Sequence, residues 1–488
     1  MKRIVYLCLV GNRASRALAI ALLAGSLLAP ARAATSVEPK EGGTLRVQLS
    51  ERLTTIDPRQ LPSNPMQAAA AERVDSLLFD RLVRFDDHGA LQPALALSWQ
   101  HDAQWKRWQF VLRKGVKFSD GSPFTTESAA LAIQQLLGNA FDVSATDDSI
   151  VILADHSLQG LPAMLAQGRF FIFRTANEGS LLGTGPFLIS IWPVAGAEAK
   201  LALTANESCW AGRPFVDKIE ITMGVDPQQQ ANAIAFGQAD VVDLPAPQVR
   251  REAQRGVRTV SSDPVDLFAL QFVIARPGAQ DARVRQAISL AIDRASIADV
   301  ILQRQGVVAG GLLPNWISGY AHLFPATMDT ARAKELLAAA REVSHPTPLV
   351  LVYDSVDGES RAVADRVAVN LKEAGIAVQV SGRQEATKMA SADIRLVRRR
   401  IFAPDPEIAL AELLTSLGEP PTEMETLEQT YAAERAPIDA FRIVPLVHIS
   451  ESFGLSPQVR DWMAPRWGGW RLEDVWLGPT QSAAGTAP

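Results

Sequence analysis

The sequence contains very little cysteine and has no strong excess of charge of either sign. Cys8 and Cys209 are the only cysteines among 488 residues, and Cys8 lies in the first apolar segment, so the rest of the chain cannot form an internal disulfide. A net charge of −5, from 48 basic and 53 acidic residues, excludes a general attraction to nucleic acid. The chain must therefore be held together by apolar cores, and 488 residues are too many for one of them.

Signatures of catalysis and of metal or nucleotide binding are also missing. The six histidines are scattered, and no pair has the spacing of a zinc site. Neither a G-x-S-x-G nucleophile elbow nor a G-x-x-x-x-G-K-[ST] phosphate loop occurs. Gly183 and Gly185 could suggest a phosphate-binding loop, but no lysine follows them and Pro186 comes next. This segment is therefore interpreted as a turn that leads into a strand. We expect no cofactor, no metal site and no catalytic residue.

The first 33 residues are typical of a secretory signal peptide. Lys2 and Arg3 begin the chain, residues 17–29 are almost entirely apolar, and Ala31 and Ala33 supply the small residues that a signal peptidase reads. The apolar run is shorter than the roughly 20 residues that a membrane-spanning helix needs. The pattern predicts cleavage near Ala33 and a periplasmic protein.

Strand-like and helix-like segments alternate along the remaining chain. Apolar spacing predicts a strand at 43–50, a helix at 67–82 and a helix from 127 to 137 with Thr126 as its N-cap. Two strand–helix–strand units are predicted at 218–244 and 348–380, and one amphipathic helix at 281–302. Two such α/β regions favour two lobes, and the cleft between domains is where small ligands usually bind.

Several blocks of sequence, in order, match one family of exported proteins. The chain resembles the family 5 extracellular solute-binding proteins of ABC importers, which include binders of dipeptides, oligopeptides, nickel and glutathione. The matching blocks are GGTLRV (42–47), IDP (56–58), LFDRLVRFDDHGALQPALALSW (78–99), FVLRKGVKFSDGSPFTTE (110–127), GTGPF (183–187), CWAGRPFVDKIEI (209–221), AFGQADVVDL (235–244) and DARVRQAISLAIDR (281–294).

The resemblance implies a periplasmic-binding-protein-like α/β fold with two lobes, of type II and the large cluster C kind, with an extra small domain. It implies that lobe I is discontinuous and that the small domain is appended to it. The implied division is 1–33 signal peptide; 34–60, 183–265 and 451–488 lobe I; 61–182 small domain; and 266–450 lobe II.

The resemblance also implies a function. The protein is expected to capture a peptide-like or other small polar solute and to deliver it, unaltered, to an inner-membrane ABC permease with its ATPase subunits. It is expected to work as a monomer and without nucleic acid. Two alternatives stay open: a binder of a chelated metal or an anionic compound, and an exported hydrolase, which would need a nucleophile–base pair that the motifs do not show.

One departure from the family concerns the solute. Peptide binders of this family carry an aspartate four residues before a proline, and this aspartate pairs with the α-ammonium of the peptide. Counting back from Pro406 places Phe402 at that position. An ammonium without its carboxylate loses a charge-assisted hydrogen bond. Peptide binding in the usual mode is therefore in question, unless Asp405 substitutes.

Arg398 and Arg400 precede this position and share one face of a predicted strand. If this face is turned toward the cleft, two guanidinium groups would suit a carboxylate or a phosphate of the solute. If it is turned outward, the arginines form a solvated edge. Both interpretations stay open at this stage.

The remaining candidate ligand-binding residues come from loops and from tryptophans. Thr55 and Asp57 belong to the loop after the first strand, which could equally pack within its lobe. Trp210 and Trp316 could serve as ligand platforms or as core residues. With Arg398, Arg400, Phe402 and Asp405 they complete the predicted site.

Overall fold

The computed structural model describes residues 38–479, with gaps at residues 61, 63, 178, 193–198, 342–347, 385–391, 421, 423, 466 and 468. The predicted signal peptide lies outside the described residues. The chain divides into residues 1–39 and residues 40–488, and the second unit contains all the elements described below. No helix in the described part of the chain is long and apolar enough to cross a membrane.

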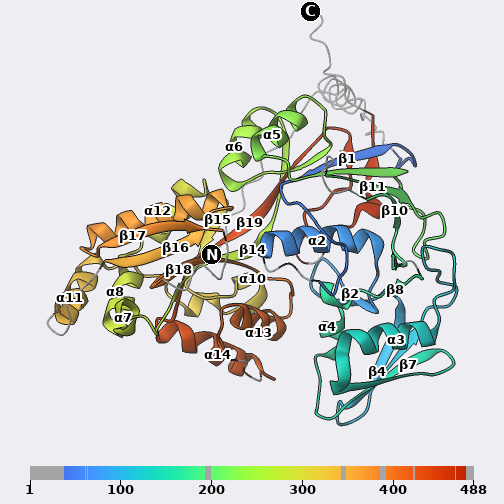
Figure 1. The fold of residues 1–488 in the computed structure, drawn as a ribbon, viewed down its shortest axis with the longest axis horizontal. Coiled ribbons are helices and arrows are strands. Elements are labelled where there is room, and N and C mark those ends of the chain that lie inside the picture. The colour runs from blue at the N-terminus through green and yellow to red at the C-terminus, as the bar shows by residue number, and fades with distance from the viewer. Residues whose placement is uncertain are drawn as a thin grey trace, which may run out of the picture. The chain divides into compact units, whose positions relative to one another are not determined.

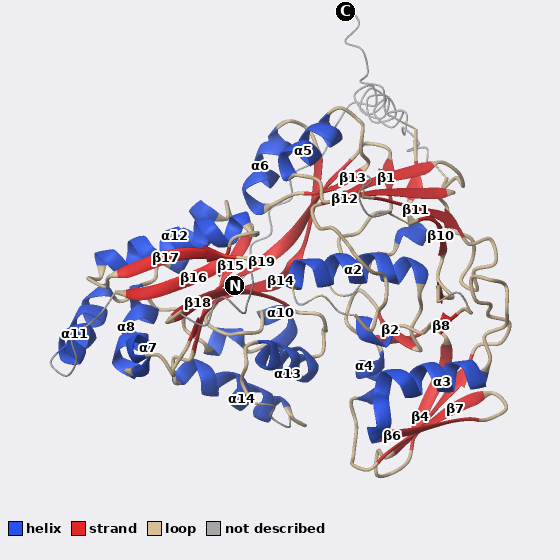
Figure 2. Cartoon of the chain, in the orientation of Figure 1, coloured by secondary structure: helices blue, strands red, loops and turns tan. Residues whose placement is uncertain are grey.

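Eleven strands of the described residues join in one mixed sheet (Figures 1 and 2). Their order is β10-β11-β12-β1-β13-β19-β14-β18-β16-β17, and β15 pairs with β19 at one side. The strands are β1 (Thr44–Leu49), β10 (Phe187–Ile191), β11 (Lys200–Ala205), β12 (Lys218–Met223), β13 (Val241–Asp243), β14 (Arg258–Phe272), β15 (Gly306–Val308), β16 (Leu349–Asp354), β17 (Val378–Arg383), β18 (Ile394–Arg400) and β19 (Ile443–Leu455).

Two long strands, β14 and β19, run through the middle of this sheet and connect its two halves. β14 has 15 residues and β19 has 13, and they pair with each other in antiparallel register. Near the C-terminal end of β19, its other edge pairs with β13. Near the C-terminal end of β14, its other edge pairs with β18. Their register shifts between Ser261 and Asp266, and such bulges bend a strand pair. The two halves therefore meet at a bent pair of strands.

The half that contains β1 and β10–β13 has its own apolar core, here called the lobe I core. It includes Leu45, Leu203 and Ile219, which are fully buried, and α5 (Pro227–Ala235) and α6 (Ala246–Gln254) cover the same half (Figure 1). Asp226 caps α5 by accepting a hydrogen bond from the Gln228 N–H at 2.8 Å. Gly237 follows with φ of +67°, a conformation that favours glycine and ends the helix.

The half that contains β14–β18 is here called lobe II. It has apolar cores on both faces of the sheet. One core packs β14, β16 and β18 against α8, α11 and α12, and the other packs β14 and β18 against α13. The unit at 348–380 is confirmed, since β16 and β17 are parallel and are joined by α12. The helices are α7 (Pro277–Gln280), α8 (Ala282–Ala291), α9 (Arg294–Ser296), α10 (Asn315–Ser318), α11 (Thr330–Arg341), α12 (Gly358–Glu373), α13 (Pro406–Ser416) and α14 (Leu427–Asp439).

The predicted continuous helix at 281–302 is wrong. α8 ends at Ala291, and a short α9 and a π-helix at Ile297–Ile301 follow. The Asp293 side chain accepts a hydrogen bond from the Ser296 N–H at 2.9 Å and so starts a new helix. The Arg294 side chain turns inward and donates from Nε to the Pro445 carbonyl at 2.8 Å. Local capping therefore breaks a segment whose apolar spacing is helical throughout.

A third group of elements forms a small sheet with its own core. Phe110, Ile133 and Ile150 are fully buried there. The N-cap of α3 is Thr125 rather than Thr126, because the Thr125 hydroxyl accepts a hydrogen bond from the Ser128 N–H. The elements are β4 (Ala96–His101), β5 (Arg107–Leu112), β6 (Phe141–Ala145), β7 (Ser149–Ala154), α3 (Thr126–Leu137) and α4 (Leu161–Leu165), flanked by β2 (Val83–Phe85), β3 (Leu91–Pro93), β8 (Arg174–Thr175) and β9 (Leu181–Leu182).

Helix α2 (Pro65–Leu78) packs into the lobe I core through Val74 and Leu77. Asn64 caps it by accepting a hydrogen bond from the Met66 N–H at 2.8 Å, and proline occupies its first position. The turn at 183–185 is confirmed and lies against the end of this helix, since a Cβ on Gly183 would be 2.0 Å from the Leu78 carbonyl oxygen. The chain can approach the helix so closely only with glycine.

Candidate functional site

Two cavities lie beside neighbouring faces of α2, one between elements of the two lobes and the other between α2, residues 167–169 and lobe II. Met66 and Arg73 line one cavity, and Pro65, Ala68 and Glu72 line the other. Side chains seven residues apart on a helix share a face, so Met66 and Arg73 lie on one face of α2. Pro65 and Glu72 lie on the neighbouring face for the same reason. We call the first one the acidic cavity and the second one the arginine cavity.

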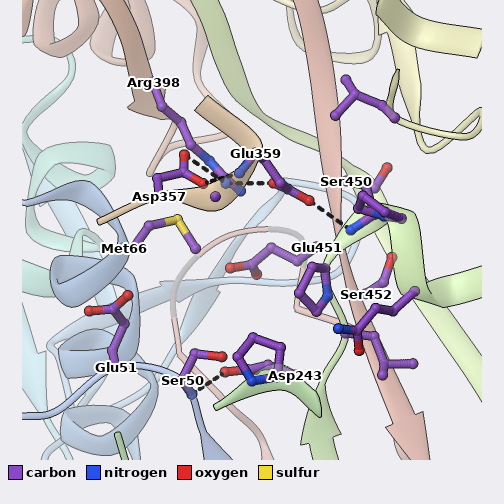
Figure 3. A pocket seen from close by; sticks show the side chains of 18 of the residues that line it. Ser50, Glu51, Met66, Asp243, Asp357, Glu359, Arg398, Ser450, Glu451 and Ser452 are labelled. Carbon is purple, nitrogen blue, oxygen red and sulfur yellow. Dashed lines mark hydrogen bonds and ion pairs between the residues drawn. The ribbon is translucent and has the colours of Figure 1, made fainter. Parts of the chain in front are cut away.

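The acidic cavity has a volume of about 320 Å³ and is shown in Figure 3. Ser50, Glu51 and Asp243 line it from lobe I, while Asp357 and Glu359, at the start of α12, line it from lobe II. Five carboxylates and two guanidinium groups line the cavity in total: Glu51, Asp243, Asp357, Glu359 and Glu451, with Arg73 and Arg398.

Arg398 is surrounded by carboxylates in the acidic cavity. Its Nη2 lies 2.6 Å from Asp266 Oδ2, and its Nη1 lies 2.8 Å from Glu359 Oε2 and 3.5 Å from Asp357 Oδ2. Burial lowers the pKa of the guanidinium, but Asp266, Asp357 and Glu359 together raise it above its ordinary value. Arg398 is therefore a charged group whose partners are all supplied by the chain.

A second buried set of ion pairs continues from there to α2. Glu451, on β19, pairs with Arg73 of α2 and lies 2.8 Å from Arg400 Nη1, and Arg400 also approaches Asp266 at 3.5 Å. Burial raises the pKa of Glu451, but Arg400 and Arg73 outweigh burial and hold the pKa at about 2. Because these residues come from α2, β14, β18 and β19, the ion pairs join the two lobes where the long strands connect them.

The negative charges of the other carboxylates in the acidic cavity are balanced less completely by cationic groups. Burial raises the pKa of Glu51, and Asp243 and Asp357 raise it further. Burial also raises the pKa of Asp243 and of Glu359. The Glu51 side chain points toward the cavity and has no hydrogen bond or ion pair in the described part of the chain (Figure 3). This cavity thus has an excess of carboxylate.

The lobes touch across the acidic cavity at the first turn of two helices. Glu359 Oε1 accepts a hydrogen bond from the Ala246 N–H at 2.7 Å, and Ala246 is the first residue of α6. A carboxylate is favoured at a helix N-terminus because of the free N–H groups and the helix dipole. The same side chain therefore binds Arg398 of lobe II and a helix end of lobe I.

The arginine cavity is larger, with a volume of about 600 Å³. One wall comes from α2 and the segment after α4, with Gln167 and Arg169; the other wall comes from β18 and α13, with Arg399 and Glu412. Arg169 Nη2 lies 3.9 Å from Glu412 Oε1, a weak pair. The charged residues that line this cavity are three arginines and two glutamates: Arg169, Arg399 and Arg400, with Glu72 and Glu412.

Arg398 and Arg400 neither form a solvated edge nor carry free guanidinium groups. Arg398 lines the acidic cavity and Arg400 lines the arginine cavity, and both are buried in ion pairs. Two residues near them have different surroundings. Phe402 lines the arginine cavity and a neighbouring cavity of about 140 Å³, while Asp405 caps α13 by accepting a hydrogen bond from the Ile408 N–H at 3.0 Å.

The other four predicted site residues lie away from the acidic and arginine cavities. Thr55 and Asp57 line a separate cavity of about 800 Å³ beside β9 and β10, and Asp57 pairs with the neighbouring Arg59 at 2.7 Å. Trp210 donates a hydrogen bond to Asp80 at 2.8 Å. Trp316 donates one to the Pro264 carbonyl at 2.8 Å, next to the bend in β14.

Several lining residues were not predicted from the sequence. Gln167, Arg169 and Arg399 line the arginine cavity, and no motif marks them. Glu451 carries a weak signal, since a charged residue stands within the apolar strand β19, and a buried charge needs a partner. The described residues contain no group of three or more His, Cys, Asp or Glu side chains that could hold a metal ion.

Comparisons with known proteins agree with this architecture. The model of "Bacterial extracellular solute-binding proteins, family 5 Middle" matches residues 90–434. The nickel-binding periplasmic protein of Escherichia coli is 27% identical over 358 residues, which are 64% of this chain and 67% of that protein. The probable D,D-dipeptide-binding periplasmic protein of the same organism is 24% identical over 374 residues, 70% of each chain.

Two solved structures have the same fold over most of the chain. NikA from Brucella suis, in complex with Fe(III)-EDTA, has a TM-score of 0.78 at 20% identity, covering 89% of this chain and 100% of that one. The oligopeptide-binding protein AppA from Bacillus subtilis, in complex with a nonapeptide, has a TM-score of 0.75 at 16% identity, covering 91% and 100%. These likenesses confirm the predicted two-lobed α/β fold.

Proposed function

The chain belongs to the bacterial extracellular solute-binding proteins of family 5, and from this premise we propose that it captures a small solute between its lobes for an ABC importer. The observation that carries the proposal is the pair of cavities beside α2, one of about 320 Å³ between the lobes and one of about 600 Å³ that faces lobe II. Among the strands of the described residues, only β14 and β19 run from one half of the sheet to the other, and their register shifts between Ser261 and Asp266. Such a connection suits hinge closure around a ligand.

The solute is a peptide-like or other small polar molecule. Relatives in the family are named for nickel, D,D-dipeptides and di- or tripeptides, so the family accommodates chemically different solutes. A metal ion would have to enter as a complex with its own ligands, because the described residues supply no cluster of metal ligands. Phe402 in place of the family's aspartate argues against the usual recognition of a peptide ammonium.

Delivery involves an inner-membrane permease and its ATPase subunits, with the receptor as a monomer in the periplasm. The composition of residues 1–33 and the periplasmic names of the relatives support export. Expression in a Gram-negative host should place the protein in the osmotic-shock fraction, with an N-terminus that begins after Ala33. A full-length N-terminus in the membrane fraction would contradict cleavage.

The division into domains that we propose is 34–60, 183–265 and 451–488 for lobe I, 61–182 for the appended domain and 266–450 for lobe II. Separate apolar cores support it: one consists of residues between Leu82 and Ile172, and another of residues between Phe268 and Ile449 together with Ala246 of α6. α2 contributes to the lobe I core, so the appended domain is anchored to lobe I through this helix. Limited proteolysis should cut first between these cores.

The protein binds and releases its solute without chemistry. The relatives are named as binding proteins, and this favours a receptor over an exported hydrolase. Turnover of a model ester or amide by the purified protein would contradict a purely binding role.

Thermal denaturation in the presence of candidate solutes tests the proposed function. A ligand that binds only the folded protein stabilises it by about 2.7 kcal/mol at 100 times its Kd, so its melting temperature rises. Di- and tripeptides, glutathione, a nickel–histidine complex and sugar phosphates are suitable solutes. We expect at least one class to raise the melting temperature in a saturable way. No shift with any class, together with no co-purifying solute by mass spectrometry, would contradict solute capture.

A further inference from the structure

Gln167 is the most unusual polar residue of the arginine cavity. Its side chain is 3% exposed, and neither Oε1 nor Nε2 has a hydrogen-bond partner among the described residues. Leaving a buried polar group unpaired costs about 1–3 kcal/mol. Gln167 is one of the residues that line the cavity, so a group bound there can supply both the missing donor and the missing acceptor.

Arg399 is the second group with unused hydrogen-bonding capacity there. It donates from Nε to the Ser416 carbonyl at 3.2 Å and from Nη1 to the Arg398 carbonyl at 2.9 Å. No carboxylate of the described residues lies within 4 Å of it, in contrast to Arg398 and Arg400 on the same strand. Burial lowers the pKa of Arg399, and the positive charge of Arg395 lowers it further, so an anion placed beside it would be favoured.

Each of the two carboxylates that line this cavity already faces an arginine of the chain. Glu72 lies 2.9 Å from Arg81 Nη2, and Glu412 faces Arg169. Burial raises the pKa of both glutamates. Phe402 adds an apolar ring at the position where peptide binders of the family carry an aspartate. Among the described residues of this cavity, Glu72 is therefore already paired, and Glu412 has one weak partner at 3.9 Å.

We propose that the arginine cavity binds a small solute through a carboxylate that pairs with Arg399 and an amide that hydrogen-bonds to Gln167, without a requirement for an ammonium group. The inference rests on the proposed function and names the chemical class of the solute. The volume of about 600 Å³ falls in the range of small-ligand sites, about 300–1,000 Å³. The shared chemistry occurs in N-acylated amino acids and at the C-terminus of short peptides.

Isothermal titration calorimetry with three matched probes tests this solute class. N-acetyl-L-aspartate carries carboxylates and an amide without an ammonium, its diamide is neutral, and L-alanyl-L-aspartate adds an ammonium. We expect N-acetyl-L-aspartate to bind at least tenfold more tightly than the diamide, and the dipeptide to bind no more tightly than N-acetyl-L-aspartate. Equal affinity for the diamide, or binding of the dipeptide alone, would overturn the inference.

Two variants locate the binding. Arg399→Gln should weaken binding of N-acetyl-L-aspartate at least tenfold. Arg332→Gln removes one positive charge from an exposed position on α11, which lines neither cavity, and should change the affinity less than twofold. Gln167→Met should weaken binding without lowering the melting temperature, because the unpaired amide does not stabilise the protein alone.

The outcomes separate this inference from the proposed function. Binding of any probe that is unaffected by Arg399→Gln and Gln167→Met would overturn the arginine cavity as the site, while solute capture would stand. Absence of binding by all three probes would overturn the solute class, and the broader melting-temperature screen would then decide on solute capture separately.

Discussion

The acidic cavity and the arginine cavity lie beside neighbouring faces of one helix, yet they differ in how their arginines are used. In the acidic cavity Arg398 and Arg73 are each held by two or more carboxylates of the chain. In the arginine cavity Arg399 has no carboxylate partner among the described residues, and the amide of Gln167 is unpaired. The same residue type joins two lobes through ion pairs at Arg398 and Arg73, while Arg399 keeps a guanidinium without a carboxylate partner among the described residues.

This difference shows how a structural and a ligand-directed charge can be told apart. Burying a charge is costly unless the chain supplies its partners, so complete pairing is the mark of a structural role. A polar group that stays unpaired inside a cavity is tolerated where a ligand will satisfy it, because function is often gained at some cost in stability. Stability measurements can therefore test the comparison before any solute is known.

The largest effect is expected from Arg400→Met. The substitution leaves Glu451 and Asp266 buried with fewer cationic partners, and breaking a buried ion pair in this way costs about 3–5 kcal/mol. Urea denaturation followed by circular dichroism measures the change. The control is Arg395→Met, on the same strand, which should stay within about 0.5 kcal/mol of the wild type. A cost below 1 kcal/mol for Arg400→Met would mean that the ion pairs do not join the lobes.

A somewhat smaller effect is expected from acid. The pKa of Glu451 is about 2 in the folded protein against an ordinary value of 4.5, so its ion pairs stabilise the fold above pH 4.5 and are lost as the pH falls toward 2. The contribution is on the order of 3 kcal/mol. Carboxyls with raised pKa values respond in the opposite sense, so the comparison must be with Glu451→Gln.

The measurement for Glu451 is the difference in unfolding free energy between the wild type and Glu451→Gln at a series of pH values. The wild type should exceed the variant most at pH 5–7, and the difference should shrink below pH 4. A difference that does not change between pH 7 and pH 3 would contradict the low pKa and, with it, the strength of pairing in the acidic cavity.

The smallest effect is expected from Glu51→Gln. Burial raises the pKa of Glu51, and repulsion from Asp243 and Asp357 raises it further, so removing the charge should stabilise the fold by less than about 1 kcal/mol. The gain should appear as the pH rises through the pKa and vanish in acid, because the folded pKa is the higher one. Melting temperatures at pH 4 and pH 8 measure this.

The control for Glu51→Gln is Glu373→Gln, an exposed glutamate at the end of α12. That variant should leave both melting temperatures unchanged within error. Destabilisation by Glu51→Gln at pH 8 would mean that the carboxylate has a partner, and the excess of carboxylate in the acidic cavity would then be smaller than the structure indicates.

Much of the fold could be predicted from sequence patterns. The family resemblance, the two lobes and the strand–helix–strand unit at 348–380 are confirmed, because apolar spacing and turn residues act over short distances along the chain. The long helix at 281–302 could not be predicted correctly. Its break depends on Asp293 capping a new turn and on Arg294 reaching the Pro445 carbonyl, which is 151 positions away.

The site was harder to predict than the fold. Arg398 and Arg400 were found because three consecutive arginines in a strand are conspicuous, but the sequence could not show that both are neutralised by carboxylates. Gln167 had no signal at all, since a glutamine is unremarkable until its surroundings leave it unpaired. Contact between the solute and any of the predicted site residues is still a prediction.

By itself, the sequence determined the family, the alternation of strands and helices, and the lack of any disulfide within residues 9–488, because each of these depends on residue types and their local spacing. Only the tertiary structure decided which charges are paired. Arg73 and Glu451 are 378 positions apart, and Gln167 and Arg399 line one cavity from positions more than 200 residues apart in the sequence. Charge pairing depends on distances of a few ångströms, and those distances exist only after the chain has folded.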